Sequence, residues 1–254
     1  MSSLALKRQR RNEQRCETAE DFMSYYQFYS TLRLILAGCT LLFLQNVAMA
    51  LPVGFKDSWM TMGEFSKDWK ESNLMYSFSH RDAIGIGGSN IRWNALQGAQ
   101  RSLKQTDVHY NRLLARWNTP DSQTNIFLLG GLAHANGNFF SGSQLIVQPG
   151  LQIDHETRRI YAALKWHGYY GKSLAATRTA VAGGFSFYPT EYDEWQPWFV
   201  VEVDKLGSDF KSTDGNIEVT PYLRFIHKTL FVEAGAPQKR GKSQGLKVNF
   251  RYTF

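Results

Sequence analysis

Cysteine is nearly absent from this sequence. Its two cysteines, Cys16 and Cys39, both lie near the N-terminus. Residues 51–254 therefore have no thiol for a disulfide, a thiolate nucleophile or a zinc–thiolate site. A strong excess of one charge is lacking as well, because 29 basic and 22 acidic residues give a net charge of +7. A balance of this size says little about partners.

Long apolar runs are equally scarce, and the mean hydropathy of −0.36 argues against a bundle of membrane-spanning helices. The one candidate segment, 34–54, carries no charge, and its most apolar part, 34–44, has the length of a signal-peptide core. It ends in Ala48-Met49-Ala50, a pattern that a signal peptidase accepts. We therefore expect residues 1–50 to be an N-terminal extension and a signal peptide cleaved after Ala50, and residues 51–254 to be the mature domain.

The leader leaves alternatives open. Met23 would serve as a second translation start, in which case residues 1–22 are an extension. The basic run 7–11 (KRQRR) is better explained as part of a charged leader than as a nucleic-acid site. The two weaker alternatives are an anchor that is not cleaved and a lipoprotein whose lipid is attached at Cys39.

The last eleven residues, 244–254, alternate between apolar and polar side chains with a period of two, as in a strand between an apolar and a polar environment. One face carries Leu246, Val248, Phe250, Tyr252 and Phe254, and the other carries Lys247, Asn249, Arg251 and Thr253.

This final strand resembles the end of bacterial outer-membrane β-barrel proteins, which commonly finish in an alternating strand with a terminal aromatic residue. The resemblance rests on this one strand and indicates no particular family within the class. It implies that Tyr252 and Phe254 form an assembly signal, that the barrel-assembly machinery reads it, and that the protein lies in the outer membrane. The basic residues Lys205, Lys211, Lys239, Arg240 and Lys242 would then face lipopolysaccharide at the outer rim.

The same alternation continues backwards through the mature chain. It predicts an all-β fold, a single-domain antiparallel transmembrane barrel of twelve strands, beginning near 59–65, with ten strands as the alternative. Short connections alternate with longer ones, as expected for short periplasmic turns and longer extracellular loops. The alternation is less regular at 108–117, which is compatible with a bulge.

Aromatic residues near the expected strand ends are typical of the girdles of a membrane barrel. The candidates are Trp93, Trp117, Trp166, Tyr169, Tyr188, Trp195, Trp198 and Tyr252. A soluble periplasmic barrel or sandwich is the alternative, and it would need these rings packed inward against a second sheet.

Charged residues on the polar face of the last four strands should point into the lumen. We expect Arg224, Glu233 and Arg251 to lie at one height, and Glu202, Glu218 and Lys247 to meet at mid-depth; Asp204 shares this face. Charges in such positions select among permeating solutes in channels. The equally weighted alternative is a set of salt bridges that fills a narrow barrel.

The sequence therefore favours a small pore or solute-binding channel of unknown solute. The competing hypotheses are an enzyme that modifies outer-membrane lipid, and a structural or adhesion barrel. His134 and His167 are weak candidates for catalysis, because no nucleophile stands beside them in a known motif. The spacing of the histidines gives no metal site, and no cofactor is expected.

Overall fold

The structure is a computed structural model that describes residues 52–96, 98–189 and 193–254. The expected signal peptide and the cleavage site at Ala50 lie outside these ranges. Within them the regular structure consists of β-strands. No helix of the described part is long and apolar enough to cross a membrane.

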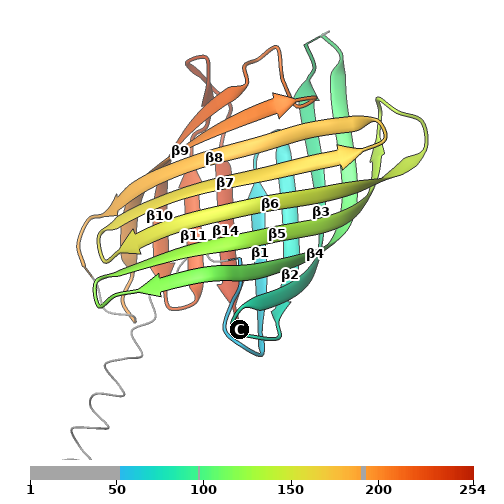
Figure 1. Cartoon of the computed structure of the whole chain (residues 1–254). Helices are drawn as coiled ribbons and strands as arrows, with labels where there is room; N and C mark the ends of the chain where they lie inside the picture. The colour runs from blue at the N-terminus through green and yellow to red at the C-terminus, as the bar shows by residue number, and fades with distance from the viewer. Residues whose placement is uncertain (1–51, 97, 190–192) are drawn as a thin grey trace, which may run out of the picture. The chain divides into compact units, whose positions relative to one another are not determined.

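The strands are β1 (Ser58–Phe65), β2 (Trp69–Ser77), β3 (Asp82–Asn94), β4 (Gln100–Asn118), β5 (Ser122–Gly137), β6 (Ser143–Thr157), β7 (Ile160–Gly171), β8 (Leu174–Ser186), β9 (Gln196–Ser208), β10 (Ile217–His227), β11 (Leu230–Gly235), β12 (Gln238–Lys239), β13 (Lys242–Ser243) and β14 (Lys247–Thr253). Each strand from β1 to β11 pairs with the next, and β14 joins β11 to β1. The result is a closed antiparallel barrel of twelve strands (Figure 1). The predicted fold class is confirmed, and the ten-strand alternative is excluded.

The seam of the barrel lies between its first and last strands. β14 pairs with β1 from Met60↔Thr253 to Phe65↔Val248. Backbone hydrogen bonds of 2.8 Å join Trp59 and Phe254 in both directions. The short strands β12 and β13 form a hairpin that touches β10 at Val219. Ring closure thus leaves no open sheet edge along the seam, which is how barrels avoid pairing with other chains.

The connections differ in length from those expected. At the end that carries Ser58 and Phe254, here called the terminal end, they are 78–81, 119–121, 158–159, 187–195 and 228–229. At the opposite end, here called the loop end, they are 66–68, 95–99, 138–142, 172–173, 209–216 and 236–246, the last of which contains β12 and β13. The long loop expected at 169–178 and the polar segment expected at 66–72 are tight turns, because the strand ladders continue into both segments.

Side chains alternate strictly across the wall of the barrel. The register joins Leu74, Ile86, Val108, Leu132, Val147 and Tyr170 in one row across β2 to β7. Every member of this row is exposed by 38% to 60% on the outer surface. The neighbouring strand positions face inward and are mostly buried. A bulge displaces Leu114 from the register of β4 with β5, at the place where the alternation of the sequence is less regular.

Part of the expected aromatic girdle lies inside the barrel. Trp93, Tyr169 and Trp198 are only 6%, 5% and 1% exposed, so their assignment to the outer girdle is wrong. All three rings occupy positions of the strand alternation that face inward. This alternation, and not the distance from the end of the strand, decides which side of the wall a ring faces. Trp117, Tyr188, Trp195 and Tyr252 are exposed by 45% or more on the described surface.

Three apolar clusters of the described residues lie in the interior, and one of them contains Trp198, Tyr222 and Phe231. At the loop end, Trp69, Trp93 and Tyr169 pack around Phe210, whose side chain comes from the β9–β10 connection. Near the terminal end, Val53 packs with Met60, Met75, Ala83, Leu113, Phe127 and Leu129. Asn111 Nδ2 donates a hydrogen bond of 3.1 Å to the Pro52 carbonyl, which fixes the chain ahead of β1 in this end of the lumen.

Candidate functional site

All six residues predicted to line the lumen point into it. Glu202, Arg224, Glu233, Lys247 and Arg251 are at most 8% exposed, and Glu218 is half-buried. They come from β9, β10, β11 and β14, the four strands at one side of the seam. The structure brings Glu202, Glu218 and Lys247 together, and separately brings Arg224 against Glu233.

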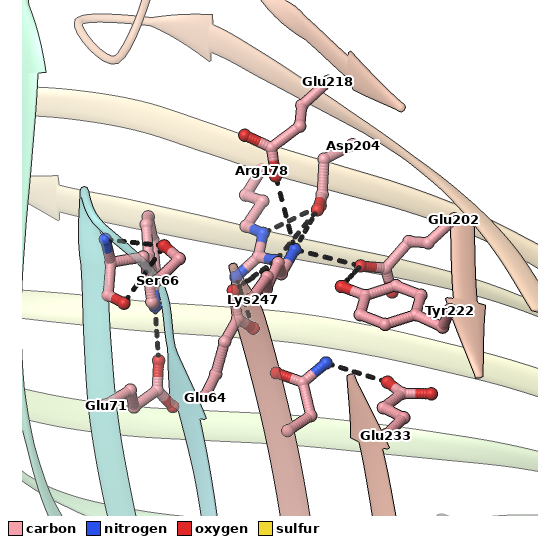
Figure 2. Close-up of polar contacts among 12 residues, drawn as sticks. Glu64, Ser66, Glu71, Arg178, Glu202, Asp204, Glu218, Tyr222, Glu233 and Lys247 are labelled. Carbon is pink, nitrogen blue, oxygen red and sulfur yellow. Dashed lines mark hydrogen bonds and ion pairs between the residues drawn. The ribbon is translucent and has the colours of Figure 1, made fainter. Parts of the chain in front are cut away.

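Lys247 lies at the centre of a network of charged side chains, which we call the Lys247 cluster (Glu64, Arg178, Glu202, Asp204, Glu218 and Lys247). Its Nζ lies 2.9 Å from Asp204 Oδ2 and 3.1 Å from Glu202 Oε1. It also lies 3.4 Å from Glu64 and 3.5 Å from Glu218, while its side chain is only 1% exposed (Figure 2). Four carboxylates thus surround two cations, so the cluster carries a formal excess of negative charge.

Arg178 is the second cation of this cluster, and sequence reasoning missed it. Its guanidinium binds Glu64 through two hydrogen bonds of 2.9 and 3.0 Å, and Asp204 through two of 2.8 and 3.0 Å. The same group lies 4.7 Å from the ring centre of Trp69. In the sequence, Arg178 belongs to the loop expected at 169–178. Residues 178, 180 and 182 share one face of a strand, so a longer strand would have placed Arg178 on the inner face together with Ala180 and Ala182.

Glu64 was also missed, although its strand was expected. It occupies the inward phase of β1 together with Met60 and Met62. Its partner Arg178 is 114 residues away along the chain and lies across the lumen. The alternation within a strand predicts whether a side chain faces the lumen or the outer surface. Which residues meet across the lumen depends also on how far each intervening strand is shifted relative to the next.

Arg224 and Glu233 form a buried ion pair below the Lys247 cluster, toward the terminal end. They are directly opposite in the β10–β11 register, and Arg224 Nε lies 2.8 Å from Glu233 Oε2. Asn249 Nδ2 donates to the other carboxylate oxygen at 2.8 Å. The guanidinium lies 4.4 Å from the ring centre of Tyr161, and Arg251 packs over the ring of Phe231. Each charge of the pair therefore has a protein partner inside the barrel.

Two cavities lie within the barrel. The larger, of about 270 Å³, extends from the Lys247 cluster toward Pro52 and Asn111 at the terminal end. The smaller, of about 120 Å³, is lined at the loop end by Trp93, Phe210 and Asp214. Glu64 and Arg178 line both cavities. The Lys247 cluster is therefore the partition between them.

The β9–β10 connection reaches across the loop end of the lumen. Trp93 Nε1 donates to the Asp209 carbonyl at 2.8 Å, and Asn94 Nδ2 donates to Asp214 at 2.6 Å. On the other side, Asp209 accepts a hydrogen bond of 2.8 Å from the backbone of Ala175. The connection is thus fastened to β3 and β8, which narrows the smaller cavity.

The basic rim expected at the loop end is only partly present. Lys205, Lys211, Arg240 and Lys242 are exposed, but Lys239 is turned inward and is 8% exposed. Its Nζ lies 3.3 Å from Glu218 and 3.9 Å from Asp68. Lys239 therefore does not belong to an outer phosphate-binding surface, because its charge is held by carboxylates inside the barrel.

The two histidines considered for catalysis lie on opposite faces of the wall. His134 belongs to β5 rather than to a loop, and its side chain is exposed on the outer face. His167, on β7, lines the larger cavity. The structure therefore does not bring His134 and His167 together. Among the residues that the structure describes, no group of three or more His, Cys, Asp or Glu side chains could hold a metal ion.

No family model matches the chain, and no curated protein matches its sequence. Among solved structures, one described as "KdgM porin" aligns with a TM-score of 0.43 and 13% identity, over 78% of this chain and 99% of that chain. "KdgM porin in complex with disordered oligogalacturonate" gives the same values. "CdiB from Escherichia coli" aligns with a TM-score of 0.35 and 8% identity, over 81% of this chain and 64% of that chain.

Proposed function

We propose that this protein is a narrow pore of the bacterial outer membrane that binds and passes a small polar solute. The exposed apolar row across β2 to β7 supports placement in a lipid bilayer, because a band of outward apolar side chains is the mark of a membrane barrel. The closed hydrogen-bonded ring supports the same placement, since lipid offers no partner for an open sheet edge.

The Lys247 cluster is the observation that carries the proposed transport function. It stands between two lumenal cavities and places four carboxylates around two cations. A permeating ion has to pass these groups where the local dielectric constant is low and charges act strongly. We therefore expect the pore to conduct poorly and to prefer cations to anions.

Planar-bilayer recording tests this proposal. Wild-type protein should give discrete conductance steps, and a KCl gradient should give a reversal potential of the sign for cation preference. Glu202→Gln together with Glu218→Gln should lower the ratio of K⁺ to Cl⁻ permeability several-fold, because it removes the excess negative charge of the cluster.

The matched control removes two carboxylates outside the lumen. Asp57 and Asp121 are exposed at the terminal end, so Asp57→Asn with Asp121→Asn should leave the permeability ratio nearly unchanged. Absence of conductance steps from folded protein would contradict the pore and favour a barrel filled by salt bridges. Equal ratios in the wild type and the Glu202/Glu218 variant would contradict the role of the cluster.

A further inference from the structure

The larger cavity exists because glycine replaces inward side chains at several neighbouring positions. One row of the register reads Gly85, His109, Gly131 and Gln148 across β3 to β6. A Cβ atom on Gly85 would lie 2.5 Å from His109 Nε2, and one on Gly131 would lie 2.8 Å from Gln148 Oε1. The polar side chains thus lie flat over the glycines of adjacent strands, and the space in front of them stays open.

Neutral amide groups form part of the wall of this cavity. Six amide side chains line the cavity, namely Asn73, Gln105, Asn111, Gln148, Gln152 and Asn249. Three of them carry a buried polar atom without a hydrogen-bond partner in the described structure: Gln105 Oε1, Gln148 Nε2 and Asn249 Oδ1. Gln105 as a whole is only 8% exposed. Leaving such atoms unpaired is unfavourable, so they mark places where a ligand would supply the missing bonds.

The charged groups around the same cavity are nearly balanced. Five carboxylates and four cations line it. Arg178 and Arg224 are bound to carboxylates at 2.8 to 3.0 Å, and Asp107 is bound to His109 at 2.8 Å. Lys165 has the carboxylates of Glu202 and Glu233 nearby. Among the described residues that line the cavity, the buried side-chain atoms without a hydrogen-bond partner are two neutral acceptors and one neutral donor, all of them amide atoms.

We propose that this cavity binds an uncharged polyhydroxylated solute of about the size of a monosaccharide. A hydroxyl group both donates and accepts, so one molecule with several hydroxyls can satisfy Gln105, Gln148 and Asn249 together. The cavity volume of about 270 Å³ lies just below the roughly 300–1,000 Å³ of sites for larger ligands. This inference rests on the proposed function and names the class of solute.

Saturation-transfer NMR on the purified full barrel in detergent micelles tests it, because the method detects weak binding and needs no transport. The probes are D-glucose, D-galactose and D-mannose as neutral hexoses, and D-glucuronate and glycine as charged molecules of similar or smaller size. We expect saturation transfer to at least one neutral hexose, and weaker transfer to D-glucuronate and glycine. Transfer to none of the hexoses, or stronger transfer to D-glucuronate or glycine, would overturn the assignment.

Gln148→Leu and Gln105→Leu should each weaken hexose binding by about two- to tenfold, the worth of one neutral hydrogen bond. Gly131→Ala is a second route, since its new Cβ displaces the Gln148 amide instead of deleting it. Gln144→Leu is the matched control: Gln144 lies on the same strand with an unpartnered Nε2, but it does not line the cavity. Equal binding by the Gln148 and Gln144 variants would contradict the site.

This experiment separates the two proposals. Hexose binding by a protein that gives no conductance would leave the site standing and remove the pore. Conductance without hexose binding would leave the pore and remove the site.

Discussion

At the scale of single residues, the pair of Arg224 and Glu233 shows how costly it is to hold charge inside a narrow barrel. Both side chains are 6% exposed, and each contacts the other at 2.8 Å. Removing one partner of such a buried pair leaves the other uncompensated, which typically costs several times more than an exposed pair contributes.

We predict that Arg224→Met or Glu233→Gln alone lowers the free energy of unfolding by about 3–5 kcal/mol. The double variant should lose clearly less than the sum of the two, because it leaves no unpaired charge. Urea unfolding of the barrel in lipid vesicles, followed by tryptophan fluorescence, measures all three. Arg112→Met is the control, since Arg112 pairs with Asp82 at the surface and is half exposed, so little change is expected. Additive single effects would argue against the pairing.

For the charged residues of the last four strands, the direction of the side chain could be predicted from the sequence, but its partners could not. Strict alternation correctly places Glu202, Arg224 and Lys247 on the inner face. The contact of Arg178 with Glu64 joins strands on opposite sides of the lumen. Such a contact depends on strand tilt and stagger, which a period of two does not encode.

At the scale of elements, the β9–β10 connection has a defined inward position. Phe210 is 1% exposed, and its ring centre lies 5.1 Å from that of Trp93 and 5.2 Å from that of Tyr169. It also lines the smaller cavity. The connection therefore acts as a fixed constriction rather than as a loop extending outward.

We predict that Phe210→Ala increases single-channel conductance, because it removes a ring from the narrow loop end of the lumen. It should also lower the free energy of unfolding by about 3–5 kcal/mol, as expected for a buried Phe truncated to Ala. Phe225→Ala is the matched control, because Phe225 is 42% exposed on the outer face. Its conductance should equal that of the wild type, and an unchanged conductance in the Phe210 variant would rule out the constriction.

Strand number and order could be predicted from the sequence, whereas the ends of the strands could not. Polar residues such as those at 169–178 indicated a loop, yet they extend β7 and β8 to a two-residue turn. At the rim of a barrel, polar side chains are tolerated on both faces, so composition no longer separates strand from loop. The inward rings of Trp93 and Trp198 reflect the same limit.

At the scale of the whole molecule, the barrel is apolar outside and charged inside, the reverse of a soluble domain. We predict that the purified protein requires detergent and migrates faster in SDS gels before boiling than after it, because the closed ladder of hydrogen bonds resists unfolding. Val248→Pro should abolish the fast-migrating form. Val248 pairs with Phe65 and Ala234 on its two neighbours, and proline cannot donate to either ladder.

The control is Ile217→Thr. Ile217 is exposed at the first residue of β10, so this variant should keep the fast-migrating form. A wild-type protein that stays in solution without detergent, or whose mobility is the same before and after boiling, would contradict the membrane barrel.

The seam between β1 and β14 has a consequence for the time course of assembly. Because these strands are far apart in the chain and adjacent in space, any sheet formed without one of them would have two unpaired edges. Such edges pair readily with foreign strands. A sheet that lacks β14 would therefore expose β1 and β11 as open edges, and the last strand of the chain removes both edges at once.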